Sequence, residues 1–203
     1  MQIYKSKFQN SCYILFAIVL LFQKVNVCHA IEKDKDKTSA ITLFYAKKTN
    51  DAFGDTILFN AKFPSNLEFI SLALAQKFSS FKKMDIEFEG QVVNHQGVEE
   101  YKEYTAAFFF RWSDFPWNNV VDTSFAFGDG LSYTTSIPRF ESEEDKRAAK
   151  LLNFLAIEST FSLPEYKNWQ AVIRVHHRSG VFGLFSGVRG ASNAWALGLR
   201  YKF

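Results

Sequence analysis

Apolar and polar residues alternate along most of this chain, and the alternation predicts β-strands, whose successive side chains point to opposite faces. In Met84–Val93, for example, the apolar residues occupy one face and acidic residues and a glutamine the other. The same pattern predicts eight strands, at Ala40–Lys47, Leu67–Lys77, Met84–Val93, Tyr104–Ser113, Val120–Gly128, Lys150–Phe161, Trp169–His177 and Asn193–Phe203. Residues Thr56–Phe63 form either a ninth strand or a β extension of the first loop.

Strands of about ten residues, apolar on one face and small or polar on the other, are typical of transmembrane β-barrels. Opposite charges share the predicted inner faces, with Asp85, Glu87, Glu89, Asp122 and Glu158 against Arg111, Arg174 and Arg200. A soluble core buries such charges at a high cost, whereas the narrow lumen of an eight-stranded barrel can pair them. Aromatic residues make up 17% of the chain and gather near strand ends. We therefore predict an all-β fold, an eight-stranded antiparallel transmembrane β-barrel of the bacterial outer membrane, with a soluble periplasmic sandwich as the alternative.

The first 30 residues have the features of a secretory signal peptide, with basic residues followed by the apolar run CYILFAIVLLF. We expect cleavage near Ala30 and export to the outer membrane of a Gram-negative bacterium; acylation at Cys28 is a less favoured alternative. Residues 31–39 are a charged lead-in, and residues 40–203 form the barrel domain. The terminal Phe203, with apolar residues at every second position before it, is expected to be recognised by the barrel-assembly machinery.

Removal of the signal peptide changes the charge and cysteine content. Three of the 24 basic residues and none of the 21 acidic residues lie in it, so the net charge falls from +3 to zero. A neutral barrel gives no support for a nucleic-acid partner. Both cysteines, Cys12 and Cys28, also leave, which excludes a thiol nucleophile and a thiolate metal site. His95 has no second ligand at metal spacing, so neither a metal nor a cofactor is expected.

The stretch WQAVIRVHHRS, from Trp169 to Ser179, carries the candidate chemistry. If it is a strand, His177 and Ser179 lie on its apolar, outward face, while Arg174, His176 and Arg178 lie on the other. Short predicted turns at the periplasmic end place His177 and Ser179 at the outer-leaflet end. A histidine can take the proton that a serine must lose to become a nucleophile. The alternative to a catalytic pair is that both side chains lie just above the hydrocarbon and contact only lipid headgroups.

The chain resembles the lipid A 3-O-deacylase family of outer-membrane barrels and their acyloxyacyl-hydrolase-like relatives. The resemblance covers the chain from about Leu43 to its end and rests on RVHHRSGVFGLF, ASNAWALGLRYKF, FRWSDFPW and TSFAFGDGLSY. It implies an eight-stranded barrel that hydrolyses a fatty-acyl ester of lipid A, the lipid of lipopolysaccharide, at the 3 position. It also implies that Ser179 is the nucleophile and His177 the general base.

Two departures from the family pattern concern the third member of the triad. Gly180 follows the serine where the family has asparagine, and no Asp or Glu follows Ser179. The orienting group is therefore Asn193 or Asp129, which share the outward parity; Glu158 has inward parity and is more readily a lumen partner of Arg174.

Other charged and titratable residues near the predicted site have simpler interpretations. His176 is expected to be an interior histidine. Arg178 and Arg189 are expected in the outer loop region, where they either bind lipid A phosphates or are ordinary solvent-exposed loop charges. The alternative function is a non-enzymatic barrel that has lost the catalytic acid.

Overall fold

The computed structural model describes residues 38–203 except 50, 65, 140 and 142–146. The predicted signal peptide, its cleavage near Ala30, Cys28 and almost all of the charged lead-in lie outside the described residues. The strands are β1 (Ser39–Thr49), β2 (Leu67–Phe81), β3 (Met84–Gly97), β4 (Tyr101–Trp112), β5 (Asp122–Thr134), β6 (Leu151–Ser162), β7 (Trp169–Ser179) and β8 (Ala191–Lys202). Short helices are α2 (Phe53–Ile57) and two 3₁₀ turns, Pro164–Tyr166 and Val181–Gly183.

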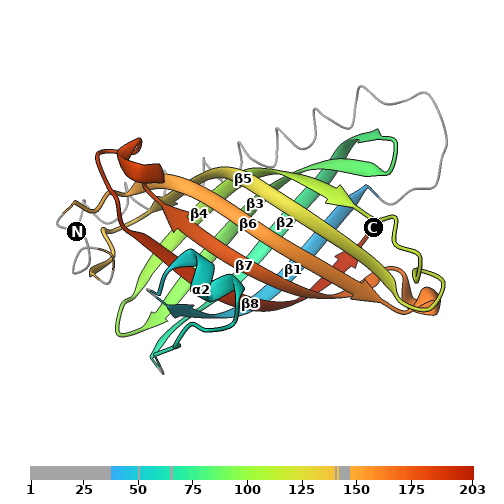
Figure 1. Cartoon of the computed structure of the whole chain (residues 1–203), viewed down its shortest axis with the longest axis horizontal. Helices are drawn as coiled ribbons and strands as arrows, with labels where there is room; N and C mark the ends of the chain where they lie inside the picture. The colour runs from blue at the N-terminus through green and yellow to red at the C-terminus, as the bar shows by residue number, and fades with distance from the viewer. Residues whose placement is uncertain (1–37, 50, 65, 140, 142–146) are drawn as a thin grey trace, which may run out of the picture. The chain divides into compact units, whose positions relative to one another are not determined.

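The eight strands form one closed antiparallel barrel in sequence order (Figure 1). The pairing of β1 with β8 closes it, and hydrogen bonds of 3.1 and 2.9 Å join the backbones of Ser39 and Phe203 at one end of this seam. The all-β, eight-stranded prediction is therefore confirmed. Closure leaves no exposed sheet edge, which a bilayer would not tolerate.

Several predicted strand bounds differ from the structure, and two of the differences lie near the candidate site. Thr56–Phe63 is not a strand, because the β1–β2 connection instead contains helix α2 and a loop. β7 was predicted to end at His177 but continues to Ser179, paired with both β6 and β8. The extension matters because it places Arg178 and Ser179 inside the regular alternation of a strand. No helix in the described part of the chain is long and apolar enough to cross a membrane.

The interior of the barrel is filled by side chains, including a buried ion network. Arg174 is fully buried and binds Glu89 through two hydrogen bonds of 2.6 and 2.8 Å, and its Nε donates to Glu158 at 2.7 Å. Glu158 also accepts from Arg111 at 2.7 Å. Because buried ion pairs must offset their desolvation by close geometry, a bidentate network is the arrangement that can persist there. The predicted Glu158–Arg174 pairing is confirmed, and Glu87, Glu89, Arg111 and Arg200 are interior as predicted, whereas Asp85 and Asp122 are only half-buried, near the starts of β3 and β5.

A second interior cluster lies toward the other end of the barrel, near the end of β7. Glu103 contacts the Nε2 atoms of His95 and His176 at 2.8 and 3.1 Å and accepts a hydrogen bond from Ser132 at 2.6 Å. His176 is thus the interior histidine that its parity predicts.

Candidate active site

The last residues of β7 alternate between the interior network and the outside of the barrel. His177 faces outward and is directly opposite Asn193 on β8. Its Nδ1 lies 2.6 Å from Asn193 Oδ1, and Asn193 Nδ2 donates to the Asp51 carbonyl at 2.7 Å. Because the amide nitrogen of Asn193 is committed to Asp51, its oxygen must accept from Nδ1–H. The neutral imidazole then has its lone pair on Nε2, the tautomer that a general base on this atom requires.

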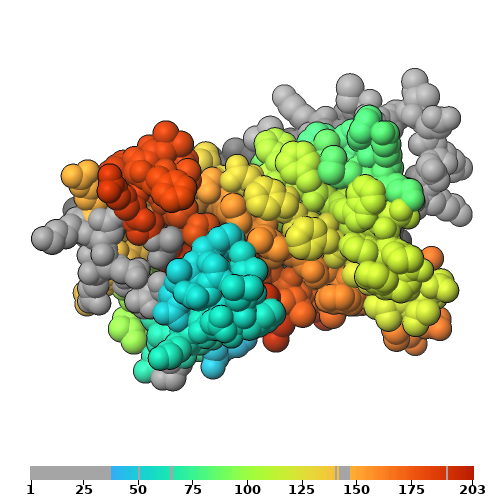
Figure 2. All heavy atoms as spheres, viewed as in Figure 1, coloured from blue at the N-terminus to red at the C-terminus, as the bar shows by residue number. Residues whose placement is uncertain are grey.

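The connection between β1 and β2 covers this histidine. We call residues 51–64 the arm; it contains α2, which packs on β7 and β8 at the outer side of the barrel wall. The Phe53 ring lies 4.4 Å from the imidazole, and Trp195 Nε1 donates to the Thr56 carbonyl at 2.9 Å. Figure 2 shows the arm, cyan to teal, raised above the wall. His177 is consequently only 9% exposed, although its parity is outward.

Ser179 lies on the same outward face, two residues beyond His177, and is half-buried. Two residues along a strand correspond to about 6.6 Å between Cα atoms, a span that a histidine ring can bridge. Among the described residues no hydrogen bond joins the two side chains. Catalytic hydrogen bonds are often absent or long before substrate binds, so this separation is compatible with a base and its nucleophile.

Asp129, the other outward candidate for the third member, has a different partner. Its Oδ1 accepts a hydrogen bond of 2.9 Å from Asn153 Nδ2, which also donates to the Gly130 carbonyl at 3.0 Å. Asn153 is directly opposite Ser179 in the β6–β7 register. The structure thus brings Asp129 near the serine through Asn153, while Asn193 is the residue bonded to the histidine.

Two residues from the sequence prediction lie inside the barrel. Glu158 is fully buried in the ion network and does not contact His177. Arg178 was expected in an outer loop as a possible ligand of lipid phosphates, but it is 1% exposed and faces the interior. It donates to Ser132 at 3.0 Å and to the carbonyls of Ala149 and Lys150 at 2.8 Å, and it pairs with Glu141. Arg178 therefore ties the end of β7 to the β5–β6 loop.

Arg189 is exposed on the β7–β8 loop, as expected. Within the described ranges, no group of three or more His, Cys, Asp or Glu residues could hold a metal ion. Nothing in the geometry of Ser179, His177 and Asn193 calls for a cofactor.

The glycine after the serine has a structural reason. A Cβ atom at Gly180 would lie 2.0 Å from the Val188 carbonyl oxygen, because the returning β7–β8 loop passes against it. Any larger residue would displace this backbone. The absence of asparagine at this position therefore follows from the path of the loop.

Comparison with known protein families finds no matching family, and comparison with curated proteins finds no match. Among solved structures the chain is similar to the outer membrane enzyme PagL, with a TM-score of 0.55, 10% identity, and coverage of 81% of this chain and 99% of that chain. The N-terminal β-barrel domain of Pseudomonas aeruginosa OprF scores 0.49 at 10% identity, covering 83% and 98% of the two chains. The fold is that of small outer-membrane barrels. At such identities the likeness extends to the fold alone.

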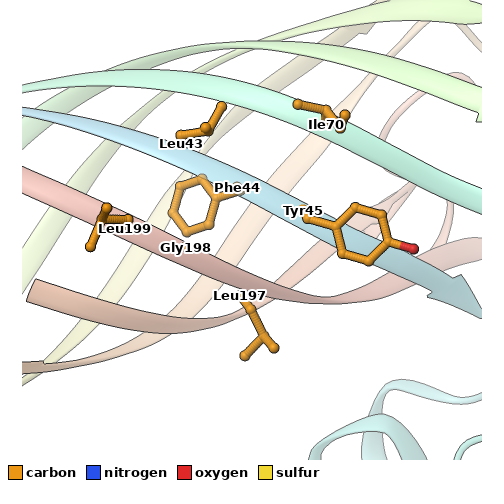
Figure 3. Close-up of a pocket in the computed structure, with 7 residues that line it drawn as sticks. All are labelled: Leu43, Phe44, Tyr45, Ile70, Leu197, Gly198 and Leu199. Atoms are coloured by element: carbon orange, nitrogen blue, oxygen red, sulfur yellow. The ribbon is translucent and has the colours of Figure 1, made fainter.

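Next to these polar residues, the outward wall of the barrel is apolar. Leu43 and Tyr45 on β1, Ile70 on β2, and Leu197 and Leu199 on β8 surround a shallow hollow (Figure 3). Gly198 and Phe44 also line it, and on the inner side of the wall a Cβ at Gly198 would lie 2.5 Å from the Phe44 ring. Apart from Tyr45, its lining residues have no polar side chain, so it offers no second candidate active site.

Sequence reasoning missed three contributors to this site: Phe53, the Asp51 carbonyl and Asn153. A five-residue helix is too short for hydrophobic periodicity to reveal it. The outward parity of Asn153 within β6 was a usable signal, because a polar residue among lipid-facing positions is costly unless it has a role.

Proposed function

We propose that the protein is an outer-membrane esterase that removes a fatty-acyl chain from a lipid of the outer leaflet. The observation that carries the proposal is the chain of contacts from Asp51 through Asn193 to His177, beside Ser179 and on the outward face of the barrel. These contacts hold the imidazole with Nε2 free to act as a general base, and an asparagine performs the same orienting role in Cys-His-Asn proteases.

In the proposed reaction, Ser179 Oγ attacks the ester carbonyl carbon while His177 Nε2 takes the hydroxyl proton. The tetrahedral intermediate expels the lipid alcohol, which receives that proton from the imidazolium. Water then attacks the acyl-serine, with His177 again as base, and the fatty acid leaves. Asn193 accepts from Nδ1–H throughout and so holds the ring in position.

The resemblance to lipid A 3-O-deacylases supports lipid A as substrate and the 3-linked ester as the bond. The same resemblance supports export by the predicted signal peptide and recognition of Phe203 by the barrel-assembly machinery. The outward position of His177 supports lateral access from the membrane rather than entry through the lumen, which side chains fill.

The test uses the full chain refolded in detergent and incubated with lipid A, with products followed by mass spectrometry. Loss of one hydroxyacyl chain is expected, and Ser179→Ala should abolish it. Ser159→Ala, another outward serine on the neighbouring β6, is the matched control and should retain activity. An unchanged lipid A mass, or equal activity in Ser179→Ala, would reject the assignment.

A non-enzymatic barrel is the second candidate. Two observations favour it: the orienting residue is neutral, and no hydrogen bond joins Ser179 to His177 among the described residues. This reading expects no acyl product under any condition, with loop-mediated binding or membrane support as the role.

A further inference from the structure

Asp129 is an acidic residue on the lipid-facing wall. Its neighbours on the same face of β5, Phe127 and Leu131, are 41% and 47% exposed, and Phe108 is directly opposite on β4. Leu155 is opposite on β6. An ionisable residue among lipid-facing apolar residues costs free energy and marks a functional site by default.

The partner of Asp129 does not neutralise it. Both hydrogens of the Asn153 amide nitrogen are used, one by Asp129 Oδ1 and one by the Gly130 carbonyl. Among the described residues Asp129 has no ion-pair partner. The pair therefore presents only hydrogen-bond acceptors to the outside, namely the second carboxylate oxygen of Asp129 and Asn153 Oδ1.

Asn153 lies directly opposite Ser179, so these acceptors border the place where the ester would bind. Neighbouring strands are about 4.8 Å apart. The ester linkages of ordinary glycerophospholipids carry no hydrogen-bond donor at that level. Acyl chains linked through an amide N–H, or bearing a hydroxyl near the linkage, do carry one.

We propose that Asp129 and Asn153 form an acceptor site that selects lipids with amide or hydroxyl donors at their acyl linkages. This inference names the substrate class of the proposed esterase and rests on that function for its biological meaning. The predicted lipid binding does not depend on the esterase activity, because binding is measured without hydrolysis.

The test compares two lipids that share a phosphocholine headgroup. Sphingomyelin carries an amide N–H and a hydroxyl at its linkage region, and phosphatidylcholine carries neither. The full chain with Ser179→Ala, in detergent micelles, is titrated with both lipids and the bound species are counted by native mass spectrometry. We expect a preference for sphingomyelin that falls about tenfold in Asp129→Leu, the size expected for losing a hydrogen bond to a charged group.

The matched control is Glu68→Leu, which removes a half-buried outward carboxylate from β2, three strands away from β5 in the closed barrel. It should keep the preference, and heat-modifiable gel mobility should confirm that every variant is folded. Equal binding of the two lipids, or a preference that survives Asp129→Leu, would overturn the inference. A preference that depends on Asp129 in a chain that fails to hydrolyse lipid A would uphold this site and reject the esterase.

Discussion

His177 Nδ1 lies 2.6 Å from Asn193 Oδ1, and the amide group of Asn193 is itself held by the Asp51 carbonyl. An asparagine without this second contact could turn its amide nitrogen toward the ring and select the opposite tautomer. The wrong tautomer places the proton on Nε2, where it blocks proton transfer from serine. Under the proposed function, the arm would therefore contribute to catalysis through one backbone carbonyl.

Asn193→Leu should lower the turnover of the proposed esterase by about 10²-fold or more, the range of a general-base contribution. The reason is loss of the acceptor that holds Nδ1–H. Turnover is measured on lipid A, and nitrogen NMR of a histidine-labelled sample reports the tautomer of His177 directly. Ser192→Ala, at the adjacent inward position, is the control. A Leu variant with full turnover and an unchanged His177 spectrum would remove Asn193 from the mechanism.

Phe53→Ala should reduce turnover by about two- to tenfold, because an aromatic contact contributes about 0.5–1.5 kcal/mol. The ring lies against the imidazole at a tilt of 40° and restricts its motion. The effect should appear in kcat more than in KM if Phe53 only positions the base. Phe63→Ala, in the same arm beyond α2, should have little effect. Equal losses in both variants would indicate a general disturbance of the arm.

Glu158→Gln tests whether this carboxylate is structural. It contacts three arginines in the lumen, so neutralising it leaves buried positive charge without compensation. Breaking a buried pair in this way costs about 3–5 kcal/mol. Urea unfolding in detergent micelles should show the loss, with Lys167→Ala at an exposed turn as the control. The folded fraction should keep its activity per molecule; a folded but inactive variant would return Glu158 to the candidate triad.

Leu58 should contact lipid. Leu58 and Phe59 are 67% and 76% exposed on the arm, and Phe59 stacks on Trp195 of the barrel wall at 4.5 Å. Their apolar surface therefore continues the lipid-facing wall. In a background with Cys12→Ser and Cys28→Ser, a fluorophore on Leu58→Cys should be quenched by phosphatidylcholine with brominated acyl chains. The same fluorophore on Lys167→Cys should not be. An unquenched, water-exposed probe at position 58 would place the arm outside the bilayer.

Alternation along the chain was sufficient to predict eight strands and the faces of His177, Asn193 and Glu158, because period-two patterning reports directly on a wall with two different sides. It failed at Arg178 for a definable reason. Its position in the alternation predicted an inward side chain, but the predicted strand ended at His177, so Arg178 was assigned to the outer loop. In the structure β7 pairs with β6 and β8 for two more residues, and Arg178 therefore faces the interior.

The contacts that complete the candidate site could not be predicted from the alternation within single strands. The Asp129–Asn153 hydrogen bond depends on the register between β5 and β6, which no single strand encodes. The arm depends on packing against residues more than 130 positions away in the chain, as the Trp195–Thr56 contact shows. Gly180, by contrast, was noticed in sequence as a departure from the family and acquired its explanation only from the approach of Val188.

The arm leaves β1 and packs on β7 and β8, so it crosses the seam at which the first and last strands meet. Asp51, Asn193 and His177 consequently come together only after the two ends of the chain have been joined. A partly assembled barrel could hold Ser179, His177 and Asn193 on the β7–β8 hairpin without the Asp51 carbonyl that fixes the Asn193 amide. Under the proposed function, catalytic competence would thus begin with the final step of assembly, and the chain would be harmless to lipids during its passage to the membrane.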